Sequence, residues 1–152
     1  LADVKTVMPH IRFVIVGDGS ERGALEWLSR KLMLQDSVRF VGNQPDIEQW
    51  YRNIHLVLLP NTQETHTQFS ITHALAARTP VLCTDISESQ EMNEQFENVF
   101  LVPKGSSEKL SEMIFSIYHD YESAFTRAMQ VQQRIFDERS KERLQEQFLR
   151  FL

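Results

Sequence analysis

Short β-branched runs alternate with longer amphipathic segments along this 152-residue chain, and that alternation most constrains its fold. Continuous apolar strands separated by helices predict a parallel sheet covered on both faces, because parallel strands need crossover connections. We therefore expect an α/β fold with a doubly wound, Rossmann-like parallel sheet and a helical tail at the C-terminus. The predicted strands are 11–16, 37–41, 54–59, 80–84 and 99–102.

The predicted helices occupy the segments between and after these strands. In the first long helix, apolar side chains recur at helical spacing and predict that Leu25, Leu28, Leu32 and Met33 lie on one face. Asp46, followed three residues later by Gln49, has the form of a capping box and predicts a short helix there. The predicted helices are 20–34, the short one from 46, one entered near 69, then 88–93, 108–119, 121–134 and 140–151.

Composition excludes several classes of function. Sixteen Lys and Arg against 21 Asp and Glu give a formal charge of -5 without a basic stripe, so nucleic acid is not an expected partner. No apolar run is long enough to span a bilayer, so we expect no transmembrane segment. The single cysteine, Cys83, lies in an apolar run and is most simply a core residue of a reduced, cytoplasmic protein. A nucleophilic role for it is the poorer alternative.

Ligands of doubly wound sheets bind outside the carboxyl ends of the strands. One loop expected there contains Gly17, Asp18 and Gly19, where the absence of a Cβ allows backbone to approach a ligand. The dinucleotide-binding fingerprint is not completed after Gly19, and a plain tight turn is the alternative. The loops expected at this edge are 17–20, 42–45, 60–68, 84–89 and 103–106.

The helix entered near Phe69 gives a second, more specific indication. The first amides of a helix have no intrahelical partner and carry the positive end of the helix dipole, which favours an anion such as phosphate. The amides expected to point at that anion belong to Gln68, Phe69, Ser70 and Ile71. The alternative is that a side chain of Thr67, Gln68 or Ser70 caps the helix, and the sequence favours neither.

Two histidines flank this helix start. His66 and His73 are seven residues apart, so His73 can lie on the helix and face back toward the loop. An ordinary polar helix residue is the alternative for His73. No Cys, His or Asp accompanies the pair at a usual ligand spacing, and we expect no metal.

Taken in order, these motifs resemble a known family. From Ile11 onward the chain resembles the C-terminal domain of the GT-B retaining glycosyltransferases of family 4, also called glycosyltransferase group 1. The segments that carry the resemblance are RFVIVGDGSERGALEWLSRKLMLQDSVRFVGNQPDIEQWYRNIHLVLLP, ALAARTPVLCTDISESQEM, NVFLVPKGSSEKLSEMI and RIFDERSKERLQEQFLRFL.

The resemblance implies a domain that binds a nucleotide-sugar donor, with no metal and no separate cofactor. It implies that Gly17 lies at the donor site and that the loop after the second strand binds the base through backbone groups. That loop corresponds to Phe40, Val41, Gly42 and Asn43. The helix start, with Gln68, Phe69, Ser70 and Ile71, is implied to receive the diphosphate.

The chain departs from the family where the family has two glutamates. The corresponding residues are Thr65, near the transferred sugar, and His73, at the ribose hydroxyls. Glu64 is one residue earlier and is the candidate for the first carboxylate and for a catalytic role. His73 can form one hydrogen bond to a ribose hydroxyl but lacks the two oxygens of a carboxylate. The glycines usual in the family here are replaced by His66, Gln68 and Arg78.

The resemblance also implies a first strand with an Arg and a Lys for the phosphates, which this sequence does not contain. We expect residues 1–152 to be one nucleotide-sugar-binding domain, a fragment of a two-domain protein without its N-terminal acceptor domain. The expected function is retaining transfer of a sugar to a glycan or lipid acceptor, as in polysaccharide biosynthesis. The isolated domain is expected to be inactive, and membrane association would come through the absent domain.

Two other functions stay open from the sequence. The first is a degenerate, non-catalytic GT-B scaffold or binding subunit, which the lack of acidic residues at 65 and 73 favours. The second is a different GT-B enzyme such as a nucleotide-sugar epimerase, but Asp85 and Glu91 fit the transferase pattern better.

Overall fold

The computed structural model describes residues 1–61 and 67–149, with side chains described as far as residue 137. The chain forms two compact units, Leu1–Ile47 and Glu48–Leu152, which we call unit 1 and unit 2. The expectation of one domain over 1–152 stays a prediction.

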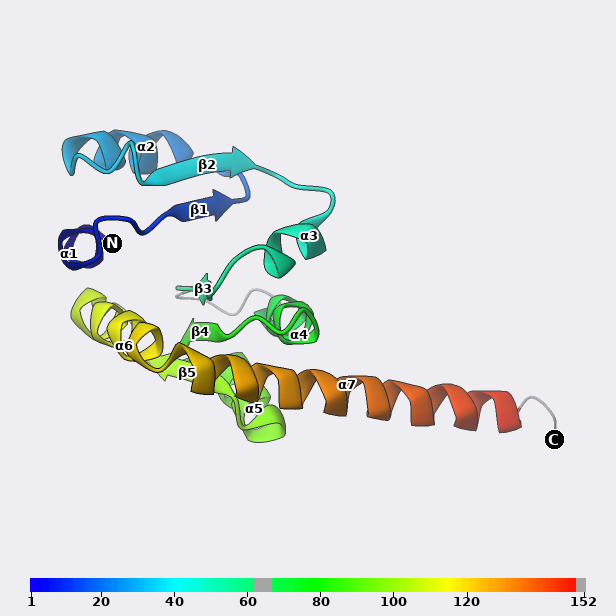
Figure 1. The fold of residues 1–152 in the computed structure, drawn as a ribbon. Coiled ribbons are helices and arrows are strands. Elements are labelled where there is room, and N and C mark those ends of the chain that lie inside the picture. The colour runs from blue at the N-terminus through cyan, green and yellow to red at the C-terminus, as the bar shows by residue number, and fades with distance from the viewer. Residues whose placement is uncertain (62–66, 150–152) are drawn as a thin grey trace. The chain divides into compact units, whose positions relative to one another are not determined.

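Unit 1 is a strand–helix–strand unit preceded by a short helix. Strands β1 and β2 are parallel, with Phe13 opposite Val38, and the helix α2 between them provides the crossover that parallel strands require (Figure 1). The ladder is irregular between Ile15 and Val16, next to the end of β1. The elements of unit 1 are α1 (Ala2–Val7), β1 (Phe13–Val16), α2 (Arg22–Lys31) and β2 (Val38–Gly42).

The apolar residues of unit 1 are less buried than their spacing predicts. The apolar side chains of α2 are largely uncovered, because Leu25, Leu28 and Leu32 are each more than 40% exposed. Met33 lies beyond the end of α2, with a positive φ of 54°, and is 81% exposed. The strand predicted at 11–16 was expected to be buried. In β1, half-buried residues instead alternate with exposed ones, which are Val14 and Val16. Spacing predicts which side chains share a face, whereas burial needs another element to cover that face.

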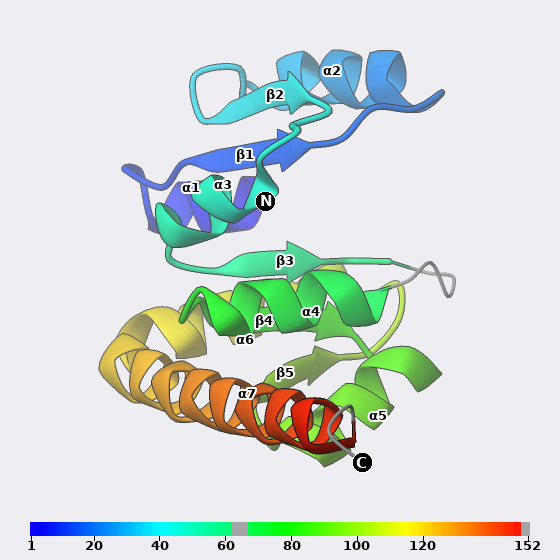
Figure 2. The ribbon, with the colours of Figure 1, turned by 90° about the vertical axis from the view of Figure 1, so that its right-hand side faces the viewer.

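Unit 2 contains a parallel sheet with strand order β3-β4-β5. Figure 2 shows these three arrows pointing the same way, with α4 and α7 on the near side of the sheet. Helix α4 packs on β4 and contacts both α5 and α7, while α6 packs on β5. The elements are α3 (Ile47–Arg52), which begins at the boundary of the units, then β3 (Val57–Leu59), α4 (Thr67–Ala76), β4 (Val81–Thr84), α5 (Ser87–Phe96), β5 (Val99–Val102), α6 (Ser107–His119) and α7 (Tyr121–Leu149).

The core of unit 2 lies between β4, α4 and α7. Every residue of β4 is buried, as expected for the central strand of a parallel sheet. Small and branched residues recur along α7 at helical spacing and let this helix lie close against α4. The buried apolar residues described on these helices are Ile71, Ala74 and Leu75 of α4, and Ala124, Ala128, Val131 and Ile135 of α7.

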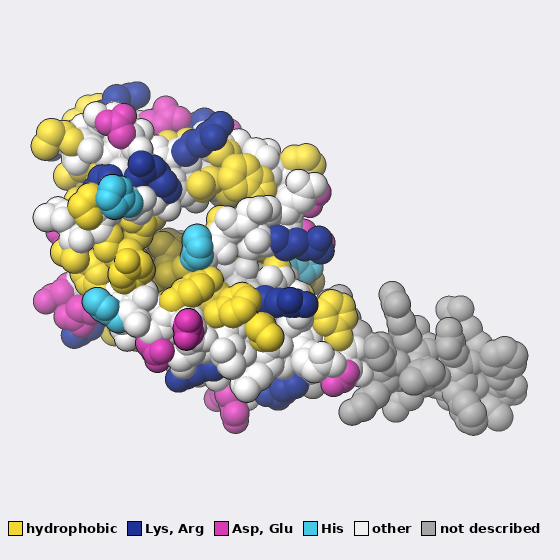
Figure 3. All heavy atoms as spheres, in the orientation of Figure 1, with side chains coloured by type: hydrophobic (Ala, Val, Ile, Leu, Met, Phe, Trp, Pro, Cys, Tyr) yellow, Lys and Arg dark blue, Asp and Glu magenta, His cyan; other side chains and the backbone are white. Residues whose placement is uncertain are grey.

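The predicted α/β class is confirmed, with parallel strands, intervening helices and a C-terminal helix. The predicted break between helices 121–134 and 140–151 is wrong, because α7 is continuous to Leu149. The intervening segment contains no Gly or Pro to end a helix. Figure 3 shows that hydrophobic side chains also reach the surface of both units. Trp27 on α2 and Phe136 on α7 are each more than half exposed.

Candidate functional site

The carboxyl ends of β1 and β2 are joined through two glycines in unit 1. The Gly17 amide donates to the Gly42 carbonyl at 2.8 Å, directly after the parallel ladder ends. Gly17 has φ +112° and Gly42 has φ +68°, backbone conformations that residues with a Cβ rarely adopt. The predicted turn after β1 therefore needs glycine for backbone reasons, whether or not a ligand approaches it.

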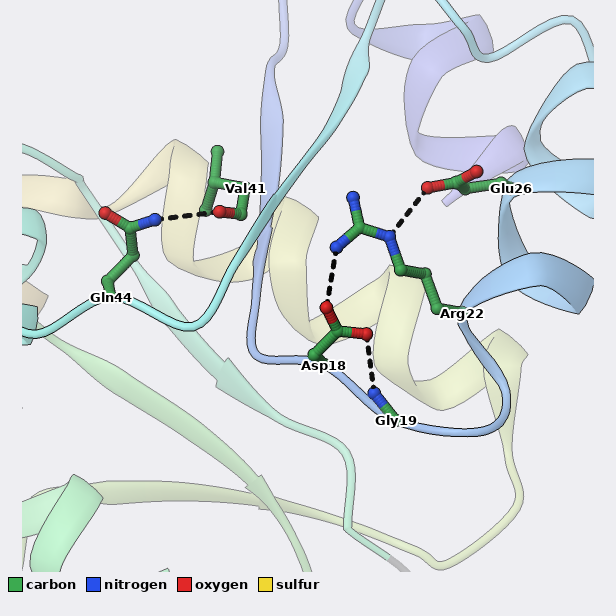
Figure 4. A network of polar contacts seen from close by, with 6 residues as sticks. All are labelled: Asp18, Gly19, Arg22, Glu26, Val41 and Gln44. Atoms are coloured by element: carbon green, nitrogen blue, oxygen red, sulfur yellow. Dashed lines mark hydrogen bonds and ion pairs between the residues drawn. The ribbon is translucent and has the colours of Figure 1, made fainter.

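Arg22, in the first turn of α2, forms the centre of a charged network at this edge (Figure 4). Its Nη1 donates to Asp18 Oδ2 at 3.0 Å and its Nε donates to Glu26 Oε1 at 2.9 Å. These hydrogen bonds, Glu26 first, raise the pKa of Arg22 above its usual value. A Cβ built on Gly42 would lie 3.3 Å from Arg22 Nη1, so the guanidinium group lies against the Gly42 backbone.

The sequence interpretation missed this network. Part of its signal was present, because Arg22 and Glu26 are four residues apart in a predicted helix, which places their side chains one helical turn apart. Asp18 lies in the loop before α2, so helical spacing does not signal its contact with Arg22. The contact between Arg22 and Gly42 had no such local signal, since the two residues are brought together by the pairing of β1 with β2.

The loop predicted to bind the base uses several of its backbone groups internally. The Val41 carbonyl accepts from Gln44 Nε2 at 2.7 Å (Figure 4), and the Gly42 carbonyl accepts from Gly17. A carbonyl has two lone pairs, so each oxygen can accept one further hydrogen bond. Phe40 lies within β2 opposite Ile15, and Asn43 is exposed just after the strand.

In unit 2, the predicted phosphate-binding helix is α4, which begins at Thr67. Of the four residues predicted to offer amides, Gln68 and Phe69 belong to the first turn of α4, and the Phe69 side chain is 68% exposed. The amide of the fifth residue of a helix already donates within it, so the Ile71 amide is used by α4 itself. The Ile71 side chain is fully buried in the core, while Ser70 is half-buried.

A carboxylate from α5 caps the start of α4. The Thr67 amide donates to Glu88 Oε2 at 2.7 Å, and Gln68 Nε2 donates to Glu91 Oε2 at 3.2 Å. Thr67 is itself fixed, because its side chain is buried and its Oγ1 accepts from Asn61 Nδ2 at 3.0 Å. The sequence interpretation considered only local caps and missed Glu88, which lies 21 residues along the chain.

The remaining predicted donor residues divide into two groups. Glu64, Thr65 and His66 lie outside the described residues, so their predicted roles stay predictions. His73 lies on α4 as expected and is half-buried, about 9 Å along the helix axis from Thr67 at 1.5 Å per residue. Its hydrogen bond to a ribose hydroxyl also stays a prediction.

Two alternatives to donor binding can be examined within the described residues. Cys83 is 1% exposed in β4, and burial raises the pKa of its thiol to about 12, so it is a core residue and a poor nucleophile. Across residues 1–61 and 67–137, no three His, Cys, Asp or Glu side chains are grouped so that they could hold a metal ion. The expectation that the site works without metal stays a prediction.

The described helices also include none with the length and apolar character needed to cross a membrane.

Comparison with known proteins gives a family match. The family model described as glycosyl transferases group 1 matches residues 1–120. A putative glycosyltransferase of Bacillus subtilis, EpsD, is 26% identical over 116 residues, which are 76% of this chain and 30% of EpsD. The chain therefore spans less than a third of the length of that relative.

Solved structures share the fold over nearly the whole chain. TarM matches with a TM-score of 0.79 at 18% identity, covering 98% of this chain and 30% of TarM. HepE of Anabaena in complex with UDP-glucose matches with a TM-score of 0.73 at 23% identity, covering 93% of this chain and 44% of HepE. The chain therefore shares its fold with part of each of these two proteins.

Proposed function

The chain belongs to the glycosyl transferases of group 1, and we propose that it is the donor-binding part of an enzyme that transfers a sugar from a nucleoside diphosphate sugar. The observation that carries this proposal is the family match over residues 1–120. The crystallised complex of HepE with UDP-glucose supports it, because that protein shares the fold and holds a nucleotide sugar.

We assign donor recognition to the carboxyl ends of the strands and to the helix start described above. In unit 1, the backbone of Val41, Gly42 and Asn43 beside Gly17 is proposed to contact the base. In unit 2, the first turn of α4 is proposed to bind the diphosphate and His73 the ribose. Glu64 is proposed to act near the transferred sugar. Amides fixed at the helix start would stabilise the charge that develops on the leaving diphosphate, which requires no metal.

The finer parts of the proposal concern the whole protein. We propose transfer with retention of configuration to a glycan or lipid acceptor, which is bound by a region outside residues 1–152. We also propose that the protein acts in the cytoplasm, in the biosynthesis of a polysaccharide. On this proposal residues 1–152 bind the donor but do not transfer the sugar alone.

Calorimetric titration of UDP, GDP and UDP-glucose into the chain tests donor binding. We expect one of the nucleotides to bind with micromolar to low-millimolar affinity, and His73→Ala to weaken that binding. The matched control is His55→Ala, because His55 is exposed and its ring contacts Tyr121 near the start of α7. No heat with any nucleotide, from a chain whose circular dichroism shows a folded α/β domain, would contradict the proposal.

A non-catalytic scaffold is the second candidate function. Two observations favour it: Thr65 and His73 stand at positions where the resemblance implies carboxylates, and Glu88 already occupies the Thr67 amide. Sugar transfer by the full-length protein from a radiolabelled donor decides between the candidates. If the protein binds a donor nucleotide, or a protein partner, but transfers no sugar to any glycan or lipid extract, the scaffold is favoured.

A further inference from the structure

Glu88 has an unusual position, because its carboxylate serves the starts of two helices. It belongs to the first turn of α5, and its Oε2 accepts from the Thr67 amide that begins α4. A negative charge is favoured at a helix N-terminus, and here α4 and α5 both present that end to the same side chain. Glu88 is half-buried, which reduces screening by solvent.

The parts that hold this contact are fixed from several sides. Ser89, fully buried, donates from Oγ to the Thr84 carbonyl at 2.6 Å and accepts from the Ile86 amide, which fixes the first turn of α5. On the other side, Asn61 holds the Thr67 side chain at 3.0 Å. The contact between α4 and α5 therefore presents Glu88 to the Thr67 amide with little freedom to move.

From these contacts we infer that Glu88 sets the affinity of this chain for nucleoside diphosphates, because its carboxylate competes with the diphosphate for the first turn of α4. This inference depends on the proposed function, in which the diphosphate binds there. A diphosphate that reaches the Thr67 amide must displace Glu88 and then remains close to its negative charge. The gain from one charge-assisted hydrogen bond is thus offset by the loss of another.

A second carboxylate nearby provides a matched control. Glu91 is one turn further along α5 and accepts from the Gln68 side chain, an exposed contact that leaves the backbone amides of α4 untouched. It carries the same charge as Glu88 on the same helix. An effect of net charge alone would therefore appear equally when either glutamate is replaced, whereas competition for the amide requires Glu88.

The test is to titrate UDP and GDP into the wild-type chain and into Glu88→Ala, Glu88→Gln and Glu91→Gln. We expect Glu88→Ala to tighten binding of the preferred nucleotide about tenfold, the scale of one partly exposed charge-assisted hydrogen bond. Glu88→Gln keeps an acceptor for the Thr67 amide but removes the charge, so it should give a smaller gain. Glu91→Gln should change the affinity less than twofold.

A structural measurement accompanies the affinities. In amide NMR spectra of Glu88→Ala, the Thr67 signal should shift during the titration. Thermal melting of each variant shows whether it folds. Glu88→Ala is expected to melt lower because α4 loses its cap, so tighter binding by a less stable variant cannot come from general stabilisation.

The outcomes separate this inference from the proposed function. If the wild-type chain binds a nucleotide and Glu88→Ala binds it equally or more weakly, Glu88 is only a helix cap and the inference is overturned while donor binding stands. A gain in Glu91→Gln equal to that in Glu88→Ala would overturn it as well. If neither the wild-type chain nor any folded variant binds UDP or GDP, the proposed function itself fails.

Discussion

Cys83 shows how one buried side chain can make the stability of unit 2 depend on pH. Burial raises the pKa of its thiol from 9.0 to about 12. Below pH 9 the thiol is protonated in the folded and unfolded chains alike, so no stability is lost. Between pH 9 and 12 only the unfolded chain releases the proton, and stability falls by up to about 4 kcal/mol.

We therefore predict that replacing Cys83 by Ala makes the free energy of unfolding less sensitive to alkali. Urea denaturation at pH 8 and pH 10.5 should show a smaller loss for Cys83→Ala than for the wild-type chain. Tyrosines and lysines titrate in both proteins. The difference between the two proteins in the unfolding free energy lost from pH 8 to pH 10.5 therefore isolates the thiol. Equal losses of unfolding free energy in the two proteins would mean that solvent reaches Cys83.

Gly42 is the second residue from which a measurable effect follows. Its φ of +68° and the Arg22 Nη1 atom 3.3 Å from a built Cβ are separate obstacles to any side chain. Gly105 has a similar φ of +75° but open space around a Cβ. We predict that Gly105→Ala costs about 1 kcal/mol of unfolding free energy, the usual strain of a left-handed residue, and that Gly42→Ala costs more.

Denaturation of the double variant Arg22→Ala, Gly42→Ala checks the cause. Removing the guanidinium should bring the cost of Gly42→Ala close to that of Gly105→Ala, because only backbone strain then remains. If the cost of Gly42→Ala is unchanged by Arg22→Ala, the contact between the two residues contributes nothing and the network of Asp18, Arg22 and Glu26 is independent of β2.

At the scale of elements, one glutamine joins α7 to the end of α4. Gln132 Nε2 donates to the Ala76 carbonyl at 2.6 Å, one of the last carbonyls of α4, and its Oε1 accepts from Arg78 Nε at 2.6 Å. Arg78 lies just beyond the helix with φ +67°, a left-handed conformation in which glycine is usual. We predict that Gln132→Ala destabilises the chain by about 1–2 kcal/mol.

The matched control for this prediction is the next residue. Gln133 is exposed on the same helix, and its side chain donates to Asp137, one turn along α7. Thermal or urea denaturation should show a loss below about 0.5 kcal/mol for Gln133→Ala, as for most surface changes. Similar losses in the two variants would mean that helix propensity, and not the junction with α4, controls the stability of α7.

The ends of the strands were predicted from the sequence better than their starts. The predicted strand ends at Leu59, Thr84 and Val102 are those of β3, β4 and β5, because Pro60 and Pro103 interrupt two of these runs and a polar turn follows the third. The predicted starts of β1 to β4 are one to three residues early, as at 54 against Val57, whereas the predicted start of β5 at Val99 is confirmed. Apolar residues that precede a strand resemble it in composition, and only pairing with a neighbour distinguishes them.

At the scale of the molecule, the edge of each sheet could be predicted but the contacts there could not. Strands that alternate with helices along the chain predict a parallel sheet. In a parallel sheet, the loops after β3, β4 and β5 lie at one edge of unit 2. The contact between Thr67 and Glu88 joins two helices from different crossovers, so no local pattern signals it. The sequence thus locates candidate donors and acceptors, whereas the fold decides which of them already bind each other.

The two units also differ in how their sheets are supported, and this predicts different local stabilities. Strand β4 is paired on both sides and wholly buried, whereas β1, within the residues that the structure describes, pairs with β2 alone and exposes Val14 and Val16. Amides exchange with solvent through local opening, which is rarer where more contacts must break. Hydrogen exchange measured by mass spectrometry should therefore show amides of Val81–Thr84 protected at least about 100-fold more than those of Phe13–Val16. Equal protection would mean that units 1 and 2 open together as one cooperative structure, because the less supported strand would then exchange only when the central strand of unit 2 also opens.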